Sequence, residues 1–148
     1  MVWSTAQAQD LYRRGPLSVV VTMGMDLATV PAERCPFADD DRRRDYLHRF
    51  DDHQFEYMML TAEVRWHDDI IARATTSGVE HGRVADGVIA NAWAWKVPGY
   101  PDPDDVIEGS PLNNVVSDAL QVAEGEGPDS ADVQAAIQAA WAWADPNA

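Results

Sequence analysis

The alternation of apolar and polar residues over positions 60–67 constrains the fold of this chain more than any other feature of its sequence. The run L-T-A-E-V-R-W-H changes character at every step. A period of two is the signature of a β-strand with one face in a core. The buried face of this strand would carry Leu60, Ala62, Val64 and Trp66.

This strand is one arm of a β-hairpin that we expect over about residues 55–77. A turn is available directly after it at Asp68 and Asp69, and a second alternation of apolar and polar residues leads up to Thr75. Good helix formers are also frequent between Glu56 and Arg65. A single long helix is therefore the competing interpretation of the same segment.

Two amphipathic helices are predicted near the C-terminus, over residues 110–124 and 130–144. Ser110 can cap the first, with Pro111 in the first helical position, and Ser130 can cap the second. Apolar residues recur with helical spacing in both segments. They are Leu112, Val115, Val116, Ala119, Leu120 and Ala123 in the first, and Val133, Ala136, Ile137, Ala140, Trp141 and Ala144 in the second.

Shorter signals predict the remaining elements. A capping pattern that begins at Ser4 and a stop at Gly15 predict a helix over 5–14. The β-branched segment 17–23 predicts a strand, and 26–38 reads as a surface connection. Acidic residues followed by arginines predict a helix over 40–50. Residues 84–97 slightly favour a third strand, and the proline-rich stretch 98–105 predicts a loop.

These elements predict one α+β domain over residues 1–148, with a small antiparallel sheet covered by helices. A chain of 148 residues has the usual size of one domain, and its 46% hydrophobic content is enough for a packed core. If residues 55–97 were helical instead, the fold would be mostly α.

The sequence also suggests where the protein works. Cys35 is the only cysteine, so an intramolecular disulfide is excluded and a reducing compartment is expected. The first residues do not combine a basic start with an apolar run, and no stretch approaches the roughly 20 apolar residues that span a bilayer. We therefore expect a cytoplasmic protein with no membrane contact.

The net charge of −14 is concentrated in the last third of the chain. Residues 101–148 contain ten acidic residues and neither lysine nor arginine. A field of this sign repels phosphate groups, so direct nucleic-acid binding is not expected. A protein partner with a basic surface is the partner that this charge favours.

Signatures of common catalytic sites are absent from the sequence, including phosphate-binding glycine loops, the nucleophile elbow and the zinc-protease motif. The nearest approach to a metal site combines His67, Asp68 and Asp69 with His81, which are weak candidates because their spacing matches no known ligand pattern. Turn formation is the simpler interpretation of the first three residues. No cofactor is expected.

The sequence favours a non-catalytic protein-binding protein that acts through an acidic C-terminal surface. The candidate partner-binding residues are Asp118, Glu124, Glu126, Asp129, Asp132 and Trp143. Size, composition and missing motifs resemble those of small accessory proteins of bacterial viruses and mobile elements, many of which block a host protein. The alternatives are a nucleic-acid mimic, a small metal-dependent hydrolase, and an oligomeric virion or assembly component.

Overall fold

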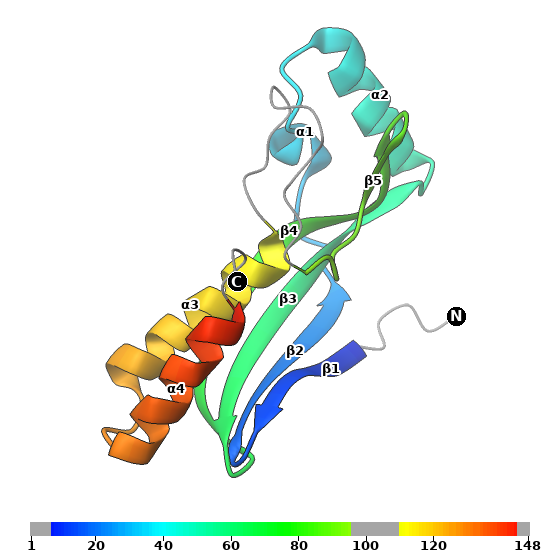
Figure 1. The fold of residues 1–148 in the computed structure, drawn as a ribbon. Coiled ribbons are helices and arrows are strands. Elements are labelled where there is room, and N and C mark those ends of the chain that lie inside the picture. Colours follow the sequence, from blue (N-terminus) through cyan, green and yellow to red (C-terminus); the bar gives the residue numbers. More distant parts are fainter. Residues whose placement is uncertain (1–6, 96–109, 145–148) are drawn as a thin grey trace.

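The computed structural model describes residues 7–95 and 110–144, and it confirms a mixed α+β fold (Figure 1). The mostly α alternative is wrong. The strands are β1 (Gln7–Arg14), β2 (Leu17–Met25), β3 (Phe55–Trp66), β4 (Asp69–Ala85) and β5 (Val88–Ala90). The helices are α1 (Pro31–Arg34), α2 (Asp40–Asp51), α3 (Pro111–Glu126) and α4 (Ala131–Ala144).

The five strands form one antiparallel sheet in the order of the sequence, β1-β2-β3-β4-β5. Short turns join β1 to β2, β3 to β4 and β4 to β5, whereas the connection from β2 to β3 contains α1 and α2. His67 and Asp68 connect β3 to β4 with φ values of 50° and 68°. Two positive φ angles in a two-residue turn match the right-handed twist of the strands on either side. The strand predicted over 60–67 corresponds to β3, which ends at Trp66, and β4 continues to Ala85, beyond the segment 55–77 over which a hairpin was expected.

The predicted helix over 5–14 is wrong, because residues 7–14 form the edge strand β1. Backbone pairing with β2 runs from Gln7 opposite Met23 to Arg14 opposite Leu17. Gly15, with φ of 60°, provides the tight turn that brings the two strands together. β2, which has a buried face, pairs with this segment through backbone hydrogen bonds. This pairing outweighs the helix-capping signal that begins at Ser4.

A first core, the helix-covered core, lies between the sheet and the helices α3 and α4. α3 lies over β3 and β4, and α4 contacts β2 (Figure 1). The sheet face turned toward them, the inner face, carries Leu17, Val19, Val21, Leu60, Ala62 and Val64, all fully buried. Trp66, which was expected to be buried with them, is only half-buried at the end of β3.

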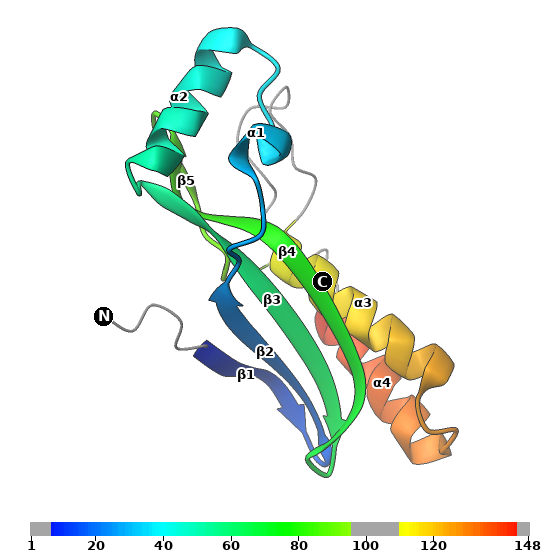
Figure 2. The same ribbon diagram turned by 180° about the vertical axis from the view of Figure 1, so that it is seen from behind.

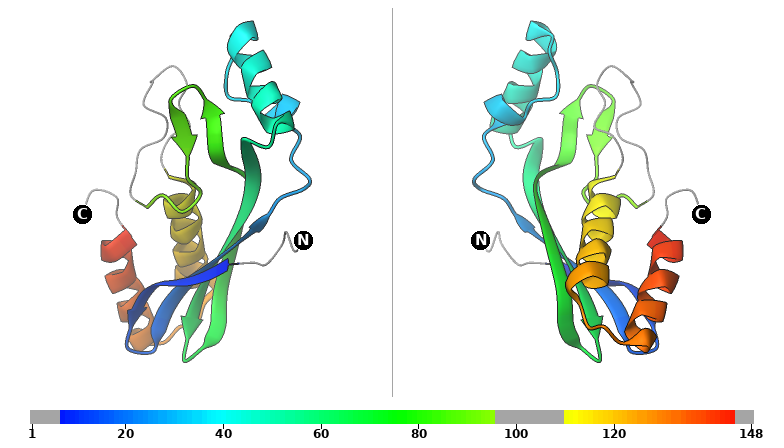
Figure 3. Two further views of the ribbon diagram at one scale, coloured as in Figure 1. Left: turned by 90° about the vertical axis from the view of Figure 1, so that its right-hand side faces the viewer. Right: turned by 90° about the vertical axis from the view of Figure 1, so that its left-hand side faces the viewer.

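A second core, the aromatic core, lies on the opposite, outer face at the far end of the β3–β4 ribbon. It consists of Phe37, Tyr46, Phe55, Tyr57 and Val84. Its position follows from the alternation of β3, since odd-numbered residues at the start of the strand face α2 while even-numbered residues face α3. Figure 3 shows α2 and the pair α3–α4 on opposite sides of the sheet.

Side chains cap α2 and α3 at their first turn, and of these two caps Ser110 was predicted from the sequence. Asp39 accepts a hydrogen bond from the Arg42 backbone N–H at the start of α2, and Ser110 accepts one from Asn113 N–H at the start of α3. The segments predicted as helical over 40–50, 110–124 and 130–144 all form helices.

The remaining expectations are met in part. The connection over 26–38 contains the one-turn helix α1, and in the described part of the segment 84–97 a separate strand forms at Val88–Ala90. The loop predicted over 98–105 lies outside the described residues. In the part of the chain that is described, none of the helices has the length and hydropathy needed to cross a membrane.

Candidate functional site

The five acidic residues predicted to bind a partner are exposed on α3, on α4 and on the turn between them. Four of them lie within residues 124–132, at the end of the helix pair that is farthest from α2 (Figure 2). We call this group the acidic turn surface. It consists of Asp118, Glu124, Glu126, Asp129 and Asp132.

Charges on the acidic turn surface are not neutralised by neighbours. Residues 110–144 contain no lysine or arginine, and none of the five acids has an ion pair among the described residues. The acids of the sheet and of α2 differ, because many of them pair with arginine. Glu63, for example, accepts hydrogen bonds from Arg65 at 2.5 Å and from Arg73 at 2.8 Å.

The C-terminal end of α3 carries acidic residues, which are unfavourable at this end of a helix. Glu124 and Glu126 lie in its last turn, which carries no basic residue. The last turn of a helix exposes carbonyl oxygens and a partial negative charge, so a carboxylate there is destabilising. Glu124 is partly compensated by a hydrogen bond from Trp141 Nε1 at 2.9 Å. Local stability does not explain this accumulation of charge.

The structure gives Trp143 a packing contact that the sequence did not show. Its ring stacks on Trp95 with a centroid distance of 4.8 Å and contacts Tyr12 at 4.7 Å. The indole is half-buried against the helix-covered core. It therefore holds α4 against β1 and the segment after β5, and its role in partner binding stays a prediction.

The weak metal candidates are not brought together. His67 and Asp68 form the β3–β4 turn and Asp69 begins β4, whereas His81 lies twelve residues along the same strand, roughly 35–40 Å of extended chain away. Among the described residues, no group of three or more His, Cys, Asp or Glu side chains is arranged to hold a metal ion.

A buried polar network beside the aromatic core was not found from the sequence. It is organised around Gly78, an extra residue in β4 where the register with β3 shifts. The Gly78 N–H donates to Asp26 Oδ2 at 2.7 Å, and its carbonyl accepts from Arg34 Nε at 2.8 Å. The N–H and the carbonyl of Gly78 are thus both hydrogen-bonded, although neither pairs with β3. These two bonds also fix the connection after β2, which carries Asp26 and Arg34, to β4.

The network continues to the hydroxyl groups of the aromatic core. Arg34 also pairs with Glu80 at 3.5 Å, and Glu80 accepts a hydrogen bond of 2.5 Å from the Tyr46 hydroxyl. The hydroxyls of Tyr46 and Tyr57 are 2.7 Å apart. Burial is the main cause that raises the pKa of Tyr46 well above its usual range, and it raises the pKa of Tyr57 to about 12. Both phenols therefore stay protonated and act as hydrogen-bond donors.

Asp26 holds the opposite end of the network as a carboxylate. Burial alone would raise its pKa, but hydrogen bonds from Thr29, Gly78 and Ala28 outweigh it, so that the pKa lies below its usual range. A carboxylate with this many donors is fully occupied, so Asp26 contributes negative charge but no free oxygen to its surroundings.

Two neighbouring pockets open where β2 leaves the sheet, and they share Met25 and Glu56. The smaller, of about 190 Å³, is lined by Gln7, Met23, Gly24, Met25, Glu56, Met58 and His81. The larger, of about 310 Å³, is lined by Met25, Asp26, Leu27, Thr29, Phe50, Asp51, His53, Phe55, Glu56 and Tyr57. Three methionines, two free carboxylates and an aromatic wall are thus brought together by the fold.

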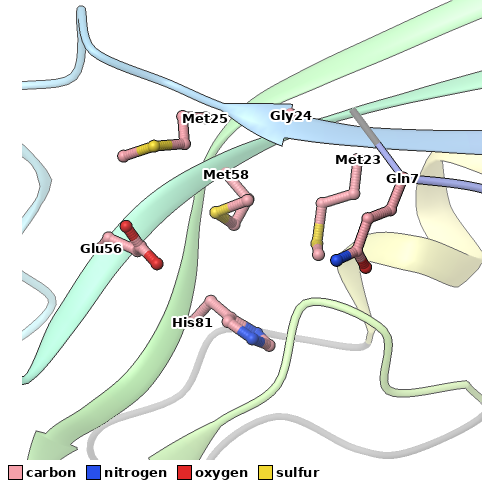
Figure 4. Close-up of a pocket in the computed structure, with 7 residues that line it drawn as sticks. All are labelled: Gln7, Met23, Gly24, Met25, Glu56, Met58 and His81. Carbon is pink, nitrogen blue, oxygen red and sulfur yellow. The ribbon is translucent and has the colours of Figure 1, made fainter. Parts of the chain in front are cut away.

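Figure 4 shows Met58 between Glu56 and Met23, with Met23 beside Gln7 and with His81 facing both methionines. Thioethers and imidazole are ligands for soft metals. However, His81 Nδ1 accepts a hydrogen bond from the Ala92 N–H at 3.0 Å. The Nδ1 atom of His81 is therefore already engaged by the backbone. The smaller pocket thus combines the side chains of three methionines with the polar groups of Gln7, Glu56 and His81.

No protein-family model matches the chain, and neither a curated protein nor a solved structure shows detectable similarity to it.

Proposed function

We propose that this protein is a non-catalytic binding protein that docks the acidic turn surface on a basic surface of another protein. The observation that carries the proposal is the contrast in charge pairing. Several acids on the sheet and on α2, among them Asp45, Glu63 and Glu80, have arginine partners, whereas the acids of α3 and α4 are exposed and have none among the described residues. Complementary charge across an interface raises the association rate and selects the partner.

The placement of Glu124 and Glu126 in the last turn of α3 also supports the proposal. These residues cost stability where they stand, and a site that costs stability is often maintained for binding.

The experiment compares three forms of the protein in capture of partners from an extract of the cells that carry the gene. One is the wild type. The second replaces the acidic turn surface by Asp118→Asn, Glu124→Gln, Glu126→Gln, Asp129→Asn and Asp132→Asn. The matched control makes the same change in net charge elsewhere on the surface, by Glu33→Gln, Asp40→Asn, Asp68→Asn, Asp69→Asn and Asp86→Asn.

We expect a partner that the wild type and the control capture and that the neutralised variant loses. With the purified partner, the association rate should fall steeply as salt rises above physiological ionic strength, where the Debye length is about 8 Å. Unchanged affinity in the neutralised variant, together with association that does not depend on salt, would refute the proposal. A partner that normally binds DNA or RNA would identify the acidic turn surface as a nucleic-acid mimic.

A further inference from the structure

We infer that the two pockets at the end of β2 form a second binding site, which takes an arginine or lysine side chain of a partner protein. The site lies where β2 ends and α2 meets β3, away from the acidic turn surface at the far end of the α3–α4 pair (Figures 1 and 4). It does not depend on the function proposed above, because the two surfaces share no residue.

The negative charge of the larger pocket indicates that its ligand is a cation. Among the described residues, the larger pocket is lined by three acids, Asp26, Asp51 and Glu56, and by no lysine or arginine. Asp26 is committed to its hydrogen bonds, but Asp51 and Glu56 have neither an ion pair nor a side-chain hydrogen bond among the described residues. A cation in the pocket would therefore meet two available carboxylates and the fixed charge of a third.

Nearby cations do not already satisfy this charge. The guanidinium groups on the adjoining helices are held elsewhere, since Arg34 pairs with Glu80, and Arg49 pairs with Asp45 at 2.7 Å. A cationic side chain from outside is the missing partner of the pocket.

The apolar part of the lining selects an amino-acid side chain over a bare metal ion. Phe50 is half-buried on one wall, and Met25 connects this pocket to the methionine-lined one. Arginine and lysine carry an alkyl stem that packs on such surfaces while the charged group reaches a carboxylate. Guanidinium groups also lie favourably on aromatic rings, as Arg42 does over Phe37 at 4.5 Å in the same region.

Methyl-labelled methionine provides a direct test by NMR. Nα-acetyl-arginine amide is titrated into the full chain, and Nα-acetyl-citrulline amide, which has nearly the same shape but no charge, serves as the ligand control. The Met25 methyl signal should shift most because Met25 lines both pockets, and Met23 and Met58 should shift less. Met59 is exposed and lines neither pocket, so its signal should not move.

Two variants locate the site. Asp51→Asn with Glu56→Gln should weaken binding of the arginine probe at least fivefold, while Asp68→Asn with Asp69→Asn, at the β3–β4 turn, should leave it unchanged. The neutralised acidic turn surface should also leave it unchanged, which separates this inference from the proposed function. Equal shifts with citrulline, shifts at Met59 as large as at Met25, or unaltered affinity in the Asp51/Glu56 variant would each overturn the inference.

Discussion

The two cores of this protein are held together by different physical means, although one strand contributes to both. The helix-covered core is aliphatic, and its buried side chains are mainly Val, Leu and Ala. The aromatic core has fewer members, and a buried network of carboxylates, hydroxyls and one guanidinium closes it on one side. The free energy gained by apolar burial scales with the buried area and depends little on the exact geometry of each contact. A buried polar network, in contrast, stabilises the fold only while every one of its polar groups is paired.

This comparison predicts that the largest single loss of stability comes from the helix-covered core. Leu120→Ala removes a fully buried side chain between α3 and the sheet and should cost about 2–5 kcal/mol of the free energy of unfolding. Urea denaturation measures the change. Leu27→Ala is the control, because Leu27 is 86% exposed and its loss should stay within about 0.5 kcal/mol. Equal effects of the two substitutions would contradict the assignment of this core.

A second prediction concerns the polar network, where Asp26→Asn should cost about 2–3 kcal/mol because hydrogen bonds to a charged group are lost. The Gly78 amide should lose hydrogen-exchange protection in this variant, since Asp26 is its acceptor. Asp86→Asn, at an exposed position, is the control. If Gly78 kept its protection, Asp26 would not be what fixes the bulge in β4.

The pH dependence of stability sharpens the comparison further. The pKa of Asp26 and that of Glu63 lie below their usual values, so each group stabilises the folded protein most above its unfolded pKa of about 4. This contribution is lost as the pH falls from about 4 through the lowered values. Urea midpoints measured from pH 7 down to pH 2.5 should fall less in Asp26→Asn than in the wild type. Parallel curves would show that Asp26 is not held as a carboxylate.

Removing one hydroxyl should have a smaller effect than removing the carboxylate. Tyr46→Phe deletes the donor to Glu80 and the partner of the Tyr57 hydroxyl, and should cost about 1–2 kcal/mol. Tyr12→Phe is the control, since the Tyr12 hydroxyl has no hydrogen bond among the described residues. Thermal or urea unfolding distinguishes the two. Equal stabilities would mean that the aromatic core depends on packing alone.

The smallest expected effect is an increase in the free energy of unfolding. Glu126→Lys places a positive charge at the C-terminal end of α3 and should raise the free energy of unfolding by about 0.3–1 kcal/mol. The same change should weaken binding of a basic partner. A variant that gained no stability would show that the charge at this end of α3 is already compensated.

Local patterns were enough to predict the elements whose signals are confined to a few residues. The alternation over 60–67, the cap at Ser110 and the spacing of Val115 and Leu120 each depend only on residues within the element that they predict. Residues 7–14 show the limit of this approach, because their strand exists only through pairing with β2.

The candidate sites show the same limit more strongly. Exposure of the acidic turn surface follows from the helical stripes, so the sequence could place it. The pockets could not be predicted, because Met25, Asp51 and Glu56 meet only once β2 and α2 are placed beside β3. Likewise, Asp26 and Gly78 are 52 positions apart in the chain, and no periodicity connects them.

The order of the elements along the chain has a consequence for synthesis of the protein. Every strand of the sheet pairs with the strand next to it in sequence, so the sheet can form while the chain is still emerging from the ribosome. α3 and α4 are translated after all five strands, and until they emerge the inner face of the sheet, with Val19, Leu60 and Val64, has no cover. During that interval the nascent chain presents a broad apolar surface of the kind that chaperones recognise, and a ribosome that stalls before residue 111 leaves it permanently exposed.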